Sequence, residues 1–220
     1  MPLRCWLLSQ VLLQGGLGQA RDLPSAANWT RRAAAGGVAS AQLQLGACHE
    51  RGDMVPLDVG EARRYYELAA AQGQPRALFS LGRLTRAVQT GGGAQPDSGA
   101  TARLAFQLYE RAAHLGDADA QVSVANCRRY GQGCDVDFAQ AFAWSRRAAD
   151  QDSGTAMMMV GLMYATGGPG RGVDRDEAQA AVWFARSAAR GEERALRNLR
   201  TLAAEGVEQA NVELRKLGYL

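Results

Sequence analysis

A pattern that recurs every 36 to 43 residues around a large anchor side chain is the feature that most constrains this fold. The five anchors are Trp29, Tyr65, Leu108, Trp144 and Trp183. An alanine stands three residues before each anchor, at Ala26, Ala62, Ala105, Ala141 and Ala180. Self-similarity at such a period is typical of repeat proteins, in which one supersecondary unit stacks on the next.

A helix of about fourteen residues is predicted around each anchor, because its apolar positions recur at intervals of three and four. Seven residues before the anchor stands a side chain that can cap the helix N-terminus: Asp22, Asp58, Thr101, Asp137 or Asp176. Eight residues after four of the anchors stands a glycine that can end the helix in the left-handed conformation: Gly37, Gly73, Gly116 or Gly191. The fourth repeat has Asp152 there instead, and we expect this residue to cost stability.

Another helix is predicted before the anchor helix of each following unit. It is the first helix of its repeat, and the anchor helix is the second. The first helix starts at an alanine, which is Ala41, Ala77, Ala120, Ala156 or Ala195. Four residues later comes a large aliphatic side chain, and the next position is Gly46, Gly82, Ala125, Gly161 or Arg200. An aliphatic residue beside a very small one lets two helices approach closely.

These elements predict an all-α fold, a right-handed α-α solenoid of about five helix-turn-helix repeats plus a C-terminal capping helix. The predicted single domain spans residues 1–220. Its repeats are 5–40, 41–76, 77–119, 120–155, 156–194 and a partial unit at 195–220. Cys5 lies 36 residues before Ala41, so residues 5–14 fit the first helix of a degenerate opening repeat. Residues 1–20 contain an apolar run and lack acidic residues, so an organelle or secretory targeting segment stays an alternative.

This pattern resembles the Sel-one-like repeat family, a relative of the tetratricopeptide repeat with a slightly longer unit. The resemblance rests on A-x-x-x-L-G in the first helix and D-x-x-x-A-x-x-W-[YF]-x-x-A-A-x-x-G in the second, and it covers residues 5–204. It implies an adaptor or assembly factor for other proteins. A cysteine-rich branch of the family is linked to β-lactam binding and hydrolysis and has a cysteine pair in every repeat. Here Cys48 and Cys127 share one repeat position while Cys5 and Cys134 do not, so we do not carry that activity over.

No catalytic residue, metal site or cofactor is predicted, and the chain is not expected to be an enzyme. His49 and His114 fall in different repeats, and neither has a partner at a metal-ligand spacing. The glycine-rich stretches at Gly91 and Gly167 match inter-helix turns and lack the residues of a phosphate-binding loop. The anchor aromatics Trp29, Tyr65, Trp144 and Trp183 are predicted to be core residues.

The mild charge of the chain argues against nucleic acid as a partner, because +3 is spread over 220 residues without a block of like charges. No apolar run reaches 18 residues, so direct membrane insertion is not expected either. The predicted compartment is the cytoplasm, or an organelle or the secretory pathway if residues 1–20 act as a targeting segment.

The concave face lined by the first helices is the predicted binding surface. The predicted partner-binding residues are Phe79, Arg83, Asn126, Arg129, Met158 and Leu162. The apolar members would supply contact area, and the polar members would supply directional hydrogen bonds to a protein or peptide segment. The predicted function is therefore a protein–protein interaction adaptor or assembly factor. Two alternatives stay open: an architectural subunit that docks through an insertion at residues 89–99, and a small-molecule binder or β-lactam hydrolase like the cysteine-rich branch.

Overall fold

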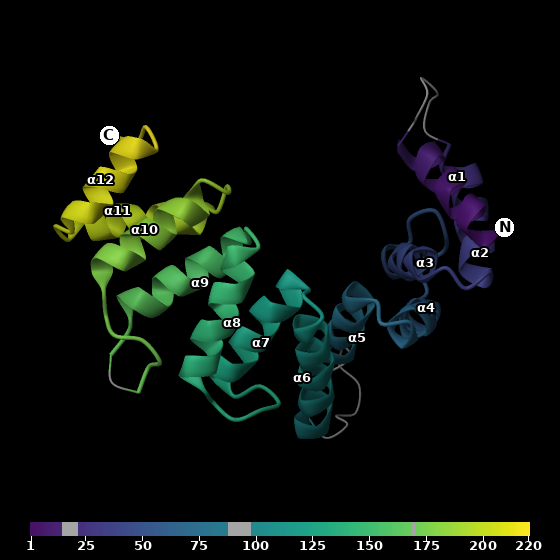
Figure 1. Ribbon diagram of the computed structural model, residues 1–220, viewed down its shortest axis with the longest axis horizontal. Helices are drawn as coiled ribbons and strands as arrows, with labels where there is room; N and C mark the ends of the chain where they lie inside the picture. The colour runs from purple at the N-terminus through teal and green to yellow at the C-terminus, as the bar shows by residue number, and fades with distance from the viewer. Residues whose placement is uncertain (15–21, 88–97, 169) are drawn as a thin grey trace. The chain divides into compact units, whose positions relative to one another are not determined.

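The computed structural model describes residues 1–14, 22–87, 98–168 and 170–220, and the regular structure in these ranges is helical throughout (Figure 1). The helices are α1 (Pro2–Gln14), α2 (Leu23–Ala35), α3 (Ala39–Arg51), α4 (Val59–Ala71), α5 (Pro75–Ala87), α6 (Ser98–His114), α7 (Ala118–Tyr130), α8 (Phe138–Asp150), α9 (Gly154–Ala165), α10 (Glu177–Ala188), α11 (Glu193–Ala204) and α12 (Glu208–Lys216). The predicted all-α architecture is therefore confirmed. Most of the insertion predicted as a docking loop, residues 89–99, lies outside the described residues.

The chain divides into two compact units, Met1–Ala94 and Gln95–Leu220. Within each unit, helices pack against their neighbours in the chain: α1 on α2 and α3 on α4 in the first unit, then α7 on α8 and α9 on α10 in the second. The closing helix α12 packs on both α10 and α11. A single domain over residues 1–220 stays a prediction.

The predicted aspartate caps of the second helices are confirmed. The Oδ1 atoms of Asp22, Asp58, Asp137 and Asp176 each accept a backbone hydrogen bond, 2.9 to 3.0 Å long, from the residue three positions on. Each bond satisfies one of the N–H groups that the first helical turn leaves without an internal partner. Hydrogen bonds to Ser25 also hold the pKa of Asp22 below its usual range.

Some predicted helix starts are wrong in detail. Thr101 does not cap its helix, because α6 already begins at Ser98. The first helices of the repeats, α3, α5, α7, α9 and α11, each begin two residues before the predicted alanine. In α7 and α9 the caps are Asp117 and Ser153, which accept from the backbone N–H of the third residue along.

The helix stops follow the predicted positions. Gly37, Gly73, Gly116 and Gly191 all have positive φ, between 77° and 96°. Asp152 has φ 71°, so the fourth repeat places a non-glycine residue in the left-handed region. Its carboxylate forms an ion pair with Arg190 of the following repeat.

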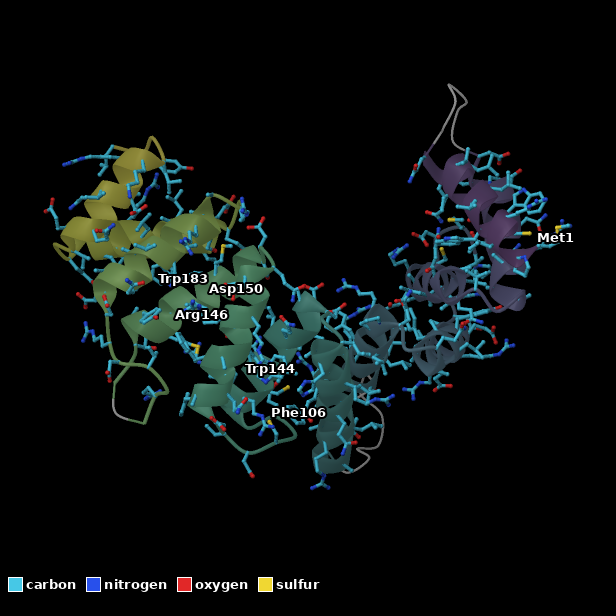
Figure 2. All side chains as sticks on the ribbon, viewed as in Figure 1. Met1, Phe106, Trp144, Arg146, Asp150 and Trp183 are labelled. Carbon is cyan, nitrogen blue, oxygen red and sulfur yellow. The ribbon has the colours of Figure 1, made fainter. Side chains whose placement is uncertain are left out.

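The anchor column is less buried than the sequence suggested. Trp144 and Trp183 are 5% exposed, as predicted for core residues, whereas Trp29 and Tyr65 are only partly buried, and Tyr65 packs against the core around Leu45. Arginine side chains cover the anchor rings. The guanidinium carbon of Arg146 lies 5.1 Å from the ring centroid of Trp183, and both residues are labelled in Figure 2. The guanidinium carbon of Arg186 lies 4.8 Å from the same centroid. The residues one position after the anchors are all buried: Thr30, Tyr66, Tyr109, Ser145 and Phe184 are at most 2% exposed.

The large rings of Tyr66 and Phe184 are each matched by a small residue on the first helix of the same repeat. A Cβ atom at Gly46 would lie 2.8 Å from the ring of Tyr66, and one at Gly161 would lie 2.7 Å from the ring of Phe184. Real Cβ contacts are not this short, so each glycine makes room for an aromatic ring. In the fourth repeat the corresponding pair is Ala125 with the smaller Ser145.

A buried glutamine joins adjacent helices at equivalent places in the two units. The side chain of Gln42 donates to the Ala34 carbonyl at 3.2 Å and accepts from Gln72 at 2.8 Å. Gln121 donates to the Ala113 carbonyl at 3.2 Å and accepts from Gln151 at 2.9 Å. Both buried amides therefore have partners for their oxygen and nitrogen, as a buried polar group requires.

The fit between Gly46 and Tyr66 gives a stability prediction. Gly46→Ala should lower the free energy of unfolding by about 1–3 kcal/mol, because an added methyl overpacks the contact. Urea unfolding followed by circular dichroism would measure the change. Gly60→Ala is the matched control, because a Cβ there meets only the end of the Asp58 side chain.

A second substitution should offset the destabilisation caused by Gly46→Ala. Tyr66→Ser combined with Gly46→Ala reproduces the alanine–serine pair of the fourth repeat. We expect the double variant to be more stable than the sum of the two single changes implies, by about 1 kcal/mol or more. Additive single effects would mean that the two side chains do not share the space described.

Candidate functional site

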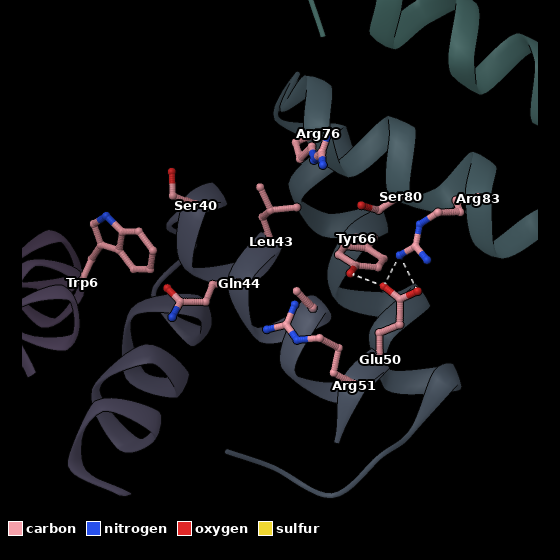
Figure 3. Close-up of a pocket in the computed structure, with 11 residues that line it drawn as sticks. Trp6, Ser40, Leu43, Gln44, Glu50, Arg51, Tyr66, Arg76, Ser80 and Arg83 are labelled. Carbon is pink, nitrogen blue, oxygen red and sulfur yellow. Dashed lines mark hydrogen bonds and ion pairs between the residues drawn. The ribbon is translucent and has the colours of Figure 1, made fainter. Parts of the chain in front are cut away.

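A cavity of about 660 Å³ lies in the first unit, between α1, α3, α4 and α5 (Figure 3). Helix α3 contributes more than half of its lining, from Ser40 at one end to Arg51 at the other. Helix α1 supplies Trp6, α4 supplies Tyr66, and one face of α5 supplies the remaining side chains. The cavity thus lies where first helices of adjacent repeats face the same space, as the repeat pattern predicted for a binding surface.

Among the described residues that line this cavity, Glu50 is the one carboxylate. The guanidinium Nη2 of Arg83 donates to both of its oxygens, at 2.5 and 2.6 Å, and the Tyr66 hydroxyl donates to Oε2 at 2.8 Å. The side chain of Glu50 is 15% exposed, whereas that of Arg83 is 52% exposed. The carboxylate of Glu50 is therefore mostly buried, whereas the side chain of Arg83 is exposed to the open space of the cavity.

The core of the repeat determines where the Tyr66 hydroxyl lies. The ring packs on Gly46 and is 1% exposed, so that only the phenol end reaches the cavity. Burial raises the pKa of Tyr66, and the hydrogen bond to Glu50 and the charge of Glu50 raise it further. The phenol therefore stays protonated and remains a hydrogen-bond donor at neutral pH.

The rest of the lining combines apolar and basic side chains. Figure 3 shows Leu43 on the stretch of wall between Arg76 and Arg51, with Trp6 on the opposite side. Arg51 also donates to Asp53 at 2.8 Å, and Arg76 lies over the Phe79 ring with 4.8 Å to the centroid. Among the described lining residues there are three arginines and one glutamate, so basic side chains outnumber acidic ones there.

Among the predicted partner-binding residues, Arg83 alone lines this cavity. Phe79 lies on the same helix beneath Arg76 but is not part of the lining. The prediction missed Tyr66, whose ring was not expected to bring a hydroxyl to the surface. It also left out Glu50, although the repeat pattern places that residue opposite the following first helix.

The other four predicted residues lie in the second unit, Asn126 and Arg129 on α7 and Met158 and Leu162 on α9. Met158 and Leu162 are partly buried against the core formed by α10, α11 and α12. Arg129 lies over the Tyr130 ring and borders a void of about 10 Å³, no larger than one water molecule. The role of these four residues in binding therefore stays a prediction.

The two histidines serve packing and hydrogen bonding. His49 stacks on Tyr65 with 5.8 Å between centroids, and its Nδ1 lies 3.1 Å from the Pro56 carbonyl oxygen. His114 meets the Trp144 ring edge-on at 5.0 Å. The described part of the chain has no group of three or more histidine, cysteine or acidic side chains placed to hold a metal ion. Within the same residues, no helix is both long and apolar enough to cross a membrane.

The repeats are matched by a sequence model of the Sel1 repeat, at residues 5–38, 39–74, 75–117, 118–153 and 154–192. These five matches cover most of the chain. The chain belongs to the Sel1 repeat family. The resemblance to Sel-one-like repeats is thereby confirmed, and each match ends two residues before the boundary predicted from the alanines.

Solved Sel1 repeat structures share this fold. A Sel1 repeat protein from Oxalobacter formigenes is 27% identical, with a TM-score of 0.80 over 98% of this chain and 85% of that protein. The protective antigen c5321 of uropathogenic Escherichia coli, described as displaying an SLR fold, is 28% identical, with a TM-score of 0.78 over 98% of this chain and 45% of that protein. The predicted α-solenoid class is thus confirmed.

Two relatives from Schizosaccharomyces pombe carry functional names. Chitin synthase regulatory factor 2 is 32% identical over 164 residues, which are 71% of this chain, and chitin synthase regulatory factor 3 is 29% identical over 206 residues, which are 77% of it. The chain spans 31% and 22% of these two proteins. The similarity therefore concerns the repeat region and not the whole of either relative.

Two buried groups beside the cavity give a prediction for alkaline pH. Burial raises the pKa of the Cys48 thiol from 9.0 to about 11, and the pKa of Tyr66 is also raised. A raised pKa of a group that is neutral when protonated favours folding below its unfolded value, and this contribution is lost as the pH rises through the folded value. The free energy of unfolding should therefore fall between about pH 9 and about pH 11.

Urea unfolding at about pH 8 and about pH 10.5 would measure this loss, which we expect to be at most about 2 kcal/mol for Cys48 at the higher pH. Cys48→Ala should reduce the pH dependence even though it lowers stability at both values. An equal decline in the wild type and in Cys48→Ala would contradict the role assigned to this thiol.

Proposed function

We propose that this chain is a protein–protein interaction adaptor whose first unit holds a segment of a partner protein in the cavity between α1, α3, α4 and α5. Membership of the Sel1 repeat family supports a protein-binding role, since Sel1 repeat proteins generally mediate protein–protein interaction. The names of the two yeast relatives, both regulatory factors, agree with this role.

The observation that carries the proposal is the chemistry of the cavity. Its volume of about 660 Å³ lies within the usual range for binding sites. The wall combines apolar side chains such as Leu43 with half-exposed arginines such as Arg83, which supply area and directional hydrogen bonds. Together they suit the side chains of a polypeptide segment.

The same lining favours binding over catalysis. Glu50 is already bound by Arg83 and Tyr66, and none of the other described lining residues is a histidine, a cysteine or an acid. General acid–base or nucleophilic chemistry needs such a partner. We therefore propose a binding protein that is not an enzyme. The net charge of only +3 over 220 residues supports a partner that is not a nucleic acid.

A charge reversal at the cavity tests the proposal. Arg83→Glu should lower the amount of partner protein captured from a native lysate by about tenfold or more, because it removes a donor and places two acids side by side. Quantitative mass spectrometry of the captured proteins measures the change. Arg86→Glu is the matched control, since it makes the same change on the same helix but outside the cavity lining.

A third variant, Arg129→Glu, shows which of the two units binds the partner. If Arg129→Glu abolishes capture and Arg83→Glu does not, the partner binds at α7, and the proposal for the cavity of the first unit is wrong. If all three variants capture the same protein as the wild type does, neither predicted surface binds it. Circular dichroism of each variant shows that the helices remain folded.

A further inference from the structure

We propose that the partner segment taken up by this cavity is acidic, and that Glu50 is an internal stand-in for a carboxylate of that segment. This inference rests on the proposed function and specifies the chemical class of the partner. It predicts that a carboxylate of the partner replaces Glu50 on Arg83 when the segment binds.

The charge of the wall is the first observation. Arg51, Arg76 and Arg83 line the cavity together with a single acid. Arg51 also pairs with Asp53, but that ion pair is exposed, 60% on one side chain and 48% on the other, so its attraction is strongly screened by solvent. A segment that carries acidic side chains is therefore favoured by this cavity over a neutral or basic one.

The geometry around Glu50 is the second observation. One nitrogen of Arg83, Nη2, donates to both oxygens of the carboxylate, and such charge-assisted hydrogen bonds are among the strong ones. The two residues come from successive repeats and are 33 positions apart. Because Arg83 is 52% exposed, an incoming carboxylate can reach its guanidinium from the open side of the cavity.

A comparison of repeats shows that the fold does not need this arrangement. Glu50, Tyr66 and Arg83 correspond by repeat position to Ala165, Phe184 and Thr201 around the fifth repeat. Phe184 is packed like Tyr66, against a glycine, but it carries no hydroxyl. The helices of that repeat pack without an acid, a phenol or an arginine at these positions, so the trio adds chemistry to the first unit that packing does not require.

The apolar part of the wall refines the partner class. Leu43 and Ala47 belong to the face of α3 that lines the cavity, and Figure 3 shows Leu43 on the wall between Arg76 and Arg51. Trp6 of α1 closes the far side, and the hydrogen bond of 2.8 Å from Gln10 to Gln44 joins α1 to α3. In a partner segment in which acidic and aliphatic side chains alternate, the acidic side chains could meet the arginines of the cavity and the aliphatic ones could meet its apolar residues.

The probe for this inference is a fluorescein-labelled peptide of repeating Glu-Leu-Ser triplets with both ends blocked, titrated with the whole chain by fluorescence anisotropy. Peptides of repeating Gln-Leu-Ser and Lys-Leu-Ser triplets are the controls. The wild type should bind the glutamate peptide about tenfold or more tightly than either control, and added salt should weaken that binding.

Two variants should change the affinity in opposite directions. Arg83→Gln should weaken binding of the glutamate peptide about tenfold, because it removes a charge-assisted hydrogen bond. Glu50→Gln should strengthen binding about three- to tenfold, because it removes the competing carboxylate and nearly preserves the shape of the side chain. A change that merely damaged the fold would weaken binding in both cases. Arg86→Gln is the control for a lost positive charge outside the cavity.

Each contrary result overturns the inference. Equal binding of the glutamate and glutamine peptides would show that the cavity does not select acids. Weaker or unchanged binding by Glu50→Gln would show that Glu50 is not a stand-in. If the glutamate peptide fails to bind while Arg83→Glu still abolishes capture of a partner from lysate, the acidic class is wrong and the proposed function stands. If neither experiment responds to Arg83, both fail.

Discussion

The close approach of α3 and α4 is the contact on which the first unit depends. Gly46 lacks a side chain where the ring of Tyr66 lies, so the two helices of the repeat meet around that ring. Because the ring is fixed in the core, its hydroxyl reaches the cavity at a defined point and holds Glu50 at 2.8 Å. Glu50 in turn meets Arg83 of the next repeat. One packing contact in the core thus positions the charged groups of the candidate site.

The same kind of approach recurs in the second unit with different side chains. Gly161 accommodates the ring of Phe184, and in the fourth repeat Ala125 stands with Ser145 at the corresponding positions. Repeat proteins tolerate such exchanges because each unit contacts only its neighbours, so one contact can change if its partner changes with it. The chemistry at the end of the buried side chain can therefore differ from repeat to repeat while the helices stay paired.

How far the sequence predicted the molecule depends on how local each feature is. The aspartate caps and glycine stops depend on residues within one turn, and most of them were predicted. The start of α7 was placed late, because Asp117 follows a stop glycine directly and was not recognised as a cap. The burial of Trp29 and Tyr65 was overestimated, since both match the anchor pattern although arginines partly cover their rings at the surface.

The candidate site was only partly predictable, since it depends on how repeats stack. Glu50 and Arg83 become neighbours only when α3 and α5 face the same space, and nothing within either helix specifies this pairing. The same limit affected Met158 and Leu162. Their position in the repeat indicated a groove, but α10 and the helices after it partly cover them. The periodicity of a helix gives the direction of a side chain and not what lies opposite it.

The energetics of the Glu50–Arg83 ion pair explain how it can form in the free protein and still be exchanged for a carboxylate of a partner. An ion pair with one half-exposed partner contributes about 0–1 kcal/mol to stability, so losing it on binding costs the fold little. Leaving the guanidinium without a partner in a closed site would cost more, because a buried charge must be compensated. Exchanging Glu50 for a carboxylate of a partner avoids that cost, since Arg83 is paired before and after. The affinity then depends on the remaining contacts, chiefly the apolar wall around Leu43 and the other two arginines. Such an exchange favours acidic partners while keeping the complex reversible.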